Sequence, residues 1–187
     1  MRLQTWALLI VAFLLVVVAR GEKEDVAAQV TAVSTTTRLS EASNGTEANN
    51  LSLAPAVSAD GRFVAFTSLA TNLVAGTSAQ QIFLRDRDSD SNGVFDEAGA
   101  VTTTLVSANA SGTVGDDTAV APAIAANGRY IAFASAATNL HPNDTDIFND
   151  IFVKDRQTGA IAHVSISSSG VDANQSSDNP AISADGR

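Results

Sequence analysis

The sequence of 187 residues contains no cysteine and little proline, histidine or aromatic residue. The absence of cysteine excludes disulfide bonds, thiolate metal sites and cysteine nucleophiles. Lys and Arg number only 11, against 20 Asp and Glu, so the formal net charge is −9. Nucleic acids and anionic lipid surfaces are bound by clusters of Lys and Arg, so this balance predicts neither as a partner. It favours cations as partners.

The residue patterns of common catalytic mechanisms are also missing from the sequence. The two histidines, His141 and His163, fall at unrelated positions. His163 alternates with apolar residues on a predicted strand, which is typical of a surface or half-buried histidine. No serine stands in a GxSxG elbow, and no Gly-rich phosphate loop joins a strand to a helix. We therefore predict that the chain has no catalytic residues and is not an enzyme.

One apolar run is long, and it lies near the N-terminus, from Trp6 to Ala19 after Arg2. This layout predicts a secretory signal peptide over residues 1–19, cleaved after Ala19, with Ala28 as the second choice. An uncleaved helical membrane anchor is the alternative, although the run is shorter than the about 20 residues that span a bilayer. Residues 20–34 are a predicted linker. Either reading predicts an exported protein, periplasmic, secreted or at the cell surface, that meets the membrane only through this segment.

A hairpin pattern occurs three times in the rest of the chain. It reads PAVSADGRFVAF from Pro55, PAIAANGRYIAF from Pro122 and PAISADGR from Pro180. An Asp-Gly or Asn-Gly pair between two apolar runs predicts a two-residue primed turn, in which both central residues have positive φ. Three copies of one hairpin indicate a repeat.

The segments around the hairpins repeat in the same order. TTTRLS, TTTLVS and IAHVS end at Ser40, Ser107 and Ser165, at a constant spacing before the three prolines. FTSLATNL matches FASAATNL, and IFLRDR matches IFVKDR. The repeat units are residues 41–107, 108–166 and a shorter 167–187. Repetition on this scale is typical of propellers and other repeat architectures.

Each unit contains four predicted strands and no helical periodicity. In the second unit they are Ala121–Ala125, Arg129–Ser135, Asp150–Asp155 and Ile161–Ile166. The second strand has apolar residues at successive positions, which point to opposite faces of the sheet. Both of its faces are therefore expected to be covered. The prolines are expected at strand starts, where a missing N–H is tolerated. The prediction is an all-β fold with blades of four antiparallel strands: two complete blades, partial flanking blades and an N-terminal apolar helix.

The units resemble the TolB-like, WD-type β-propeller repeat, whose core is a PAxSxDGRxxAFxS hairpin followed by DIFVxDR and TxRVS strands. The resemblance covers residues 35–187 and departs from the pattern at Gln80-Gln81 and at Asn127. It implies an extracytoplasmic scaffold that binds a protein or glycan partner. The alternative that it implies is the propeller of a larger exported hydrolase, a serine peptidase or a glycan-active enzyme. A propeller needs about four to eight blades to close, so we expect either a longer protein or assembly between chains.

An acidic insertion follows the first IFLRDR segment and predicts a calcium site. Its oxygen-bearing residues alternate around Gly93 as in a calcium loop, with the ligand candidates Asp88, Asp90, Asn92, the backbone carbonyl of Val94, Asp96 and Glu97. The bidentate Glu that closes an EF-hand loop is replaced by Gly99, so Glu97 or Asp96 would have to take its role. The alternative is a solvated hairpin tip with an Asn-Gly turn.

Two other sets of acidic residues are weaker candidates. Asp144, Asp146 and Asp150 could meet a cation, but no glycine turn organises them. Asp86 and Asp155 recur at the same place in both units, which favours a structural role as ion pairs between blades or as turn caps.

Overall fold

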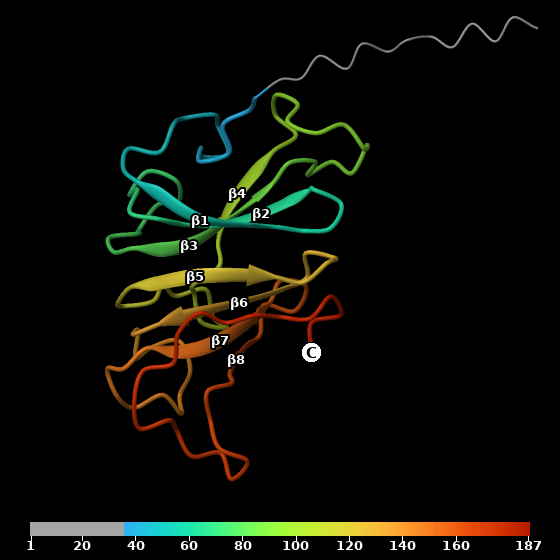
Figure 1. Ribbon diagram of the computed structural model, residues 1–187. Helices are drawn as coiled ribbons and strands as arrows, with labels where there is room; N and C mark the ends of the chain where they lie inside the picture. The colour runs from blue at the N-terminus through green and yellow to red at the C-terminus, as the bar shows by residue number, and fades with distance from the viewer. Residues whose placement is uncertain (1–35) are drawn as a thin grey trace, which may run out of the picture. The chain divides into compact units, whose positions relative to one another are not determined.

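The computed structural model describes residues 36–187, which form two four-stranded antiparallel sheets (Figure 1). The first sheet has the order β1-β2-β3-β4 and the second the order β5-β6-β7-β8. The strands are β1 (Ser52–Val57), β2 (Phe63–Ser68), β3 (Gln81–Asp86), β4 (Thr102–Leu105), β5 (Ala119–Ile124), β6 (Tyr130–Ser135), β7 (Asp150–Asp155) and β8 (Ile161–His163). Each sequence repeat thus forms one sheet, as predicted.

Several predicted features lie outside the described residues or differ from the structure. The signal peptide, N-terminal helix and linker, residues 1–34, lie outside the described part. Within residues 36–187 no helix is long and apolar enough to span a membrane. Of the predicted strands of the second unit, Asp150–Asp155 is confirmed to the residue, whereas β8 ends at His163. The predicted partial flanking blades contribute no strand within residues 36–187, where the first strand is β1 and the last is β8.

The hairpin turns are two residues longer than the predicted primed turns, because Ser58 bonds to Phe63 and Ala125 bonds to Tyr130 across loops of four residues. Gly61 and Gly128 have φ of 76° and 70°, but the residues before them, Asp60 and Asn127, do not have positive φ. The N–H of Gly128 donates to the carbonyl of Ala125 at 2.9 Å, as in a type I turn followed by a left-handed residue. Only the glycine position therefore requires a residue without a Cβ.

Pro55 and Pro122 lie inside β1 and β5 and not at the strand starts that we predicted. The register of both strands shifts at the proline, between Leu53 and Ala56 in β1 and at the equivalent place in β5. Ala54, which precedes Pro55, has a φ of 48°. Both strands are edges of their sheets, where a β-bulge accommodates a residue that lacks an N–H.

A hydrophobic core joins the two repeats. β2 and β6 are buried on both faces, as the sequence predicts, and β5 contacts β1, β2 and β3. The cluster combines residues of the first repeat (Phe63, Ala65, Ile82, Leu84, Val106) with residues of the second (Ala119, Ile131, Phe133, Ala137, Leu140, Phe152). Burial of apolar surface between neighbouring repeats is the main source of stability in repeat architectures.

Equivalent turn residues hydrogen-bond from one repeat to the next. The N–H of Ala59 donates to the carbonyl of Ala126 at 2.9 Å, and the N–H of Ala126 donates to the carbonyl of Ala184 at 3.1 Å. A Cβ built on Gly128 would meet the ring of Phe63, and a Cβ built on Gly186 would meet the ring of Tyr130. The third turn therefore packs on the second repeat as the second packs on the first.

The repeated aspartates form ion pairs within each sheet. Arg62 Nε lies 2.8 Å from Asp86, and Arg129 lies 2.7 Å from Asp155. Each pair joins the start of the second strand to the end of the third, so the predicted ion pairs between blades are wrong, while the structural role is supported. The hydrogen bond from Arg129 holds the pKa of Asp155 well below its usual range.

Two buried cations bind the segment that leads into the first strand of each sheet. Lys154 Nζ donates to the carbonyls of Ala108, Asn109 and Gly159, at 2.9, 3.1 and 2.9 Å. Arg85, at the equivalent position of the first repeat, donates to the carbonyls of Glu41 and Ala42. Burial lowers the pKa of both side chains. These residues tie the third strand of each sheet to the first residues of its own repeat.

Candidate metal sites

The acidic insertion forms a compact turn around Gly93. The carboxylate of Asp88 accepts hydrogen bonds from the backbone N–H groups of Asn92 at 2.9 Å and Gly93 at 3.0 Å. The side chain of Asn92 donates to Asp90 at 3.0 Å and to Glu97 at 2.6 Å. The N–H of Val94 donates to Asn92 Oδ1 at 2.7 Å. Asp88, Asp90, Asn92 and Glu97 are thus brought together by hydrogen bonds.

Asp96 is turned toward a different partner. Its carboxylate receives Arg87 Nη2 at 2.5 Å, and the guanidinium of Arg87 lies 4.9 Å from the ring centre of Phe95. Phe95 also lies beside Gly61, much as Phe63 lies beside Gly128 in the next repeat. The insertion therefore packs against its own sheet through Phe95 and Asp96. The calcium site stays a prediction in which Asp96 would have to leave Arg87.

Replacing Asp90 by alanine tests this prediction, because the exposed carboxylate of Asp90 accepts only one hydrogen bond, from Asn92. If the insertion binds calcium, titration calorimetry on the whole chain should show a heat that the Asp90→Ala variant weakens at least about tenfold, since a charged ligand is lost. The exposed Asp178→Ala is the matched control and should leave the heat unchanged. A wild-type chain without calcium heat, or an unchanged heat in Asp90→Ala, would contradict the prediction.

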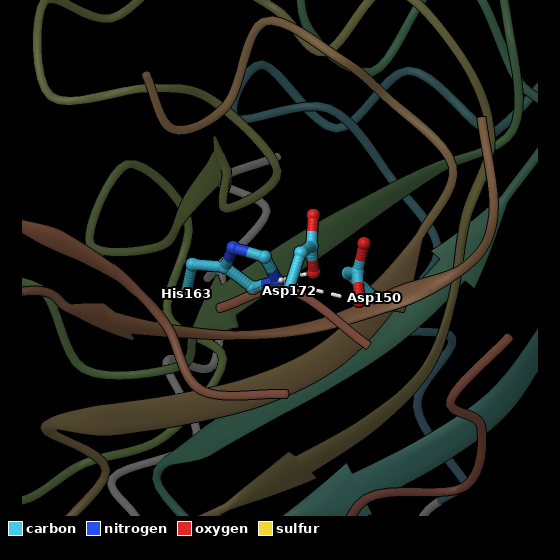
Figure 2. A group of neighbouring side chains, drawn as sticks. All are labelled: Asp150, His163 and Asp172. Carbon is cyan, nitrogen blue, oxygen red and sulfur yellow. Dashed lines mark ion pairs between the residues drawn. The ribbon is translucent and has the colours of Figure 1, made fainter. Parts of the chain in front are cut away.

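A second cluster surrounds His163 at the end of β8 (Figure 2). His163 Nε2 lies 3.3 Å from Asp150 Oδ1, 3.2 Å from Asp172 Oδ1 and 3.1 Å from Ser165 Oγ. Ser165 donates to Asp150 Oδ1 at 2.6 Å and accepts the N–H of Ile151 at 2.9 Å. In Figure 2 the imidazole nitrogen points toward both carboxylates. These side chains come from the start of β7, the end of β8 and the loop that follows β8.

Asp144 and Asp146 extend this cluster from the loop between β6 and β7. The carboxylates of Asp144, Asp146 and Asp150 offer ligand atoms within 4.8 Å of one another. Asp144 and Asp150 are buried, with 5% and 1% of their surface exposed. Burial and the neighbouring charges of Asp150 and Asp172 raise the pKa of Asp144 to about 6. Asp144 is thus buried beside other carboxylates.

The structure changes the ranking of the sequence-based candidates. His163 is buried, with its ring stacked on Phe152 at 5.2 Å between centres, so the expected surface or half-buried position is wrong. Asp144, Asp146 and Asp150 converge although no glycine turn joins them. Sequence reasoning missed Asp172 and Ser165. A comparison of equivalent positions could have found Asp172, because Val114 stands at the same distance after Ser107 as Asp172 does after Ser165.

An open cleft of about 530 Å³ lies near this cluster. It is lined by residues that follow β4, residues that follow β6 and the first residue of β8: Asn109, Ala110, Ser111, Thr138, Asn139, Leu140, His141, Pro142 and Ile161. The ring of His141 lies 6.1 Å from the ring of His163, so the cleft and the cluster are neighbours.

No family model and no curated protein matches the chain. Among solved structures, 12 chains match, and two of them are TolB from Acinetobacter baumannii and a structure from Agrobacterium tumefaciens that carries the same name. The identities are 16% and 19%, and the TM-score is 0.38 for both. The matches cover 73% and 64% of this chain but 25% and 32% of those chains. The chain thus spans about a quarter to a third of their length.

Proposed function

We propose that this chain is part of an exported, TolB-like, WD-type β-propeller that serves as a non-enzymatic scaffold for a protein or glycan partner. The observation that supports the proposal is the hydrogen-bonded series of turn residues from Ala59 to Ala126 to Ala184. Equivalent residues bond from repeat to repeat, which is how blades add to one another in a propeller.

The loops support a binding role more than the strands do. The strand sequences are similar in the two repeats, but the loops differ. The acidic insertion follows β3 and has no counterpart after β7, whereas the loop after β6 is acidic and its counterpart after β2 is not. Binding residues are found disproportionately on loops that a rigid scaffold positions. The cleft near His141 is lined by the loop after β6 and by residues of the segment that follows β4.

Export is supported by the N-terminal sequence, in which an apolar run after Arg2 has the layout of a signal peptide. Expression of the whole chain in a Gram-negative host should place it in the periplasm, with a mature N-terminus at Arg20. A variant without residues 1–19 should stay in the cytoplasm. Equal distribution of the two chains between the compartments would contradict export.

The binding role is tested on the exported chain with a glycan array and with peptidoglycan fragments. We expect saturable binding that Ala110→Trp, in the cleft, abolishes and that Ala98→Trp, on a different loop, leaves unchanged. Both alanines are exposed, so neither change disturbs the core. If glycans give no signal, proximity labelling in the periplasm should identify a protein partner instead, with the same response to Ala110→Trp. Absence of both signals would contradict the scaffold.

The second candidate is the propeller that accompanies the catalytic part of a larger exported hydrolase. Its blades would pack in the same way, so the two candidates differ in chemistry and not in fold. The purified chain should release no product from ester, peptide or glycan substrates above the buffer rate. Measurable turnover by this chain would contradict the non-enzymatic proposal.

A further inference from the structure

Four ionisable side chains, three of them buried, gather at one end of the second sheet, where the first sheet has neutral residues at the equivalent positions. The alignment of the repeats pairs Asp144 with Thr77, Asp150 with Gln81, His163 with Leu105 and Asp172 with Val114. The strand registers agree, because Phe83 pairs with Leu105 and Phe152 pairs with His163. The fold is therefore formed without these charges, and their presence in the second repeat needs another explanation.

The comparison with Gln81 shows what the carboxylate of Asp150 lacks. Gln81 Oε1 accepts from Ser107 at 2.6 Å, and its amide nitrogen donates to the carbonyls of Gly115 and Asp117 at 3.2 and 3.0 Å. Asp150 keeps the serine bond through Ser165, but its Oδ2 has no hydrogen-bond partner. Asp150 therefore presents an acceptor oxygen where Gln81 presents a donor nitrogen.

Other polar atoms of the cluster are also buried without partners. They are Asp144 Oδ1, Asp172 Oδ2 and His163 Nδ1. No Lys or Arg within residues 36–187 pairs with Asp144, Asp150 or Asp172. Even a protonated His163 would offset only one of three carboxylates. Buried unpaired charge is costly, and a bound cation is one of the few groups that removes the cost.

The geometry around His163 fits a small divalent cation. Its Nε2 lies 3.2 Å from Asp172 Oδ1 and 3.3 Å from Asp150 Oδ1. Ligand atoms in a tetrahedral zinc shell, with bonds of about 2.0–2.1 Å, are separated by about 3.3 Å. Imidazole nitrogen together with carboxylate oxygen is a donor set that suits Zn²⁺ and its neighbours better than Ca²⁺ or Mg²⁺.

We propose that the end of the second sheet binds a Zn²⁺ ion through His163 Nε2 and the carboxylates of Asp150 and Asp172. This site is independent of the scaffold proposal and of the predicted calcium loop. The ion would join the start of β7, the end of β8 and the following loop, which includes Asp172. It would thus fix the segment that leads from the second repeat toward the third hairpin.

The test uses the whole chain, freed of metal by chelation, with Zn²⁺, Mn²⁺, Mg²⁺ or Ca²⁺ added singly in a thermal-shift assay and by calorimetry. Zn²⁺ at about 100 times its Kd is expected to raise the Tm by about 5–10 °C. His163→Leu, Asp150→Gln and Asp172→Val each introduce the residue of the first repeat, so all three should fold. Each should lose the Zn²⁺ shift, and His163→Leu should be at least as stable as the wild type in chelator.

The matched control is His141→Asn, which removes the other histidine and should keep the full Zn²⁺ shift. Retention of the shift in His163→Leu, or its loss in His141→Asn, would overturn the assignment. A shift with Ca²⁺ alone that Asp150→Gln abolishes and His163→Leu retains would also overturn it, in favour of an oxygen-only site at Asp144, Asp146 and Asp150. Absence of a shift with every metal would remove the site.

Discussion

Replacing Gly128 by alanine is expected to lower the free energy of unfolding by about 3 kcal/mol, through backbone strain and overpacking together. Gly128 has a φ of 70°, which a residue with a Cβ rarely adopts. The new Cβ would lie 2.8 Å from Phe63 Cγ and closer still to Cδ2. The ring cannot move aside easily, since the guanidinium groups of Arg62 and Arg156 lie 4.8 and 4.1 Å from its centre. The Tm should fall by about 6–12 °C.

Gly159→Ala is the matched control for this experiment. Gly159 has a φ of 75°, but a Cβ built on it meets nothing within 4 Å. Its substitution should cost only the backbone strain, about 1 kcal/mol. The difference between the two variants in urea unfolding measures the contact of the Gly128 turn with Phe63. Equal losses in both would show that the turn does not pack on the preceding repeat.

The sequence predicts the blade because the pattern that specifies it is local and occurs more than once. Apolar runs on both sides of an Asp-Gly or Asn-Gly pair place β5 and β6, and the IFVKDR segment places β7 to the residue. The turn itself is less predictable. Asp-Gly permits both a two-residue primed turn and a longer turn with one left-handed glycine, and the packing of Phe63 on Gly128 requires only the glycine.

The candidate sites are harder to predict, because their residues meet only after the strands pair. The spacing of the acidic insertion favours calcium, but sequence spacing does not reveal that Arg87 holds Asp96. His163 and Asp150 belong to neighbouring strands, and Asp172 reaches them through a loop that follows β8. No short motif contains the three residues. The informative signal is the difference between equivalent positions of the two repeats, such as Leu105 and His163.

The buried cations were not predicted either, since a Lys or Arg in a strand is ordinarily exposed. Lys154 occurs in IFVKDR and Arg85 in IFLRDR, and both are buried. Each donates to several backbone carbonyls, and the bonds to Ala42 and Ala108 are buried. A cation with several donors satisfies such carbonyls together, whereas an apolar side chain of equal length satisfies none.

Lys154→Met is therefore expected to lower the free energy of unfolding by about 2–4 kcal/mol, because it removes charge-assisted hydrogen bonds to three carbonyls and leaves those acceptors unpaired. Methionine has a similar length and fills the same space, so the loss reports on hydrogen bonding and not on a cavity. Lys154→Arg, the residue of the first repeat, should cost less than about 1 kcal/mol because Arg85 makes the equivalent bonds. Guanidinium unfolding of the three chains measures both values. A Lys154→Met variant as stable as the wild type would mean that the carbonyls of Ala108, Asn109 and Gly159 find water instead, and that Lys154 does not tie the second sheet to the segment before it.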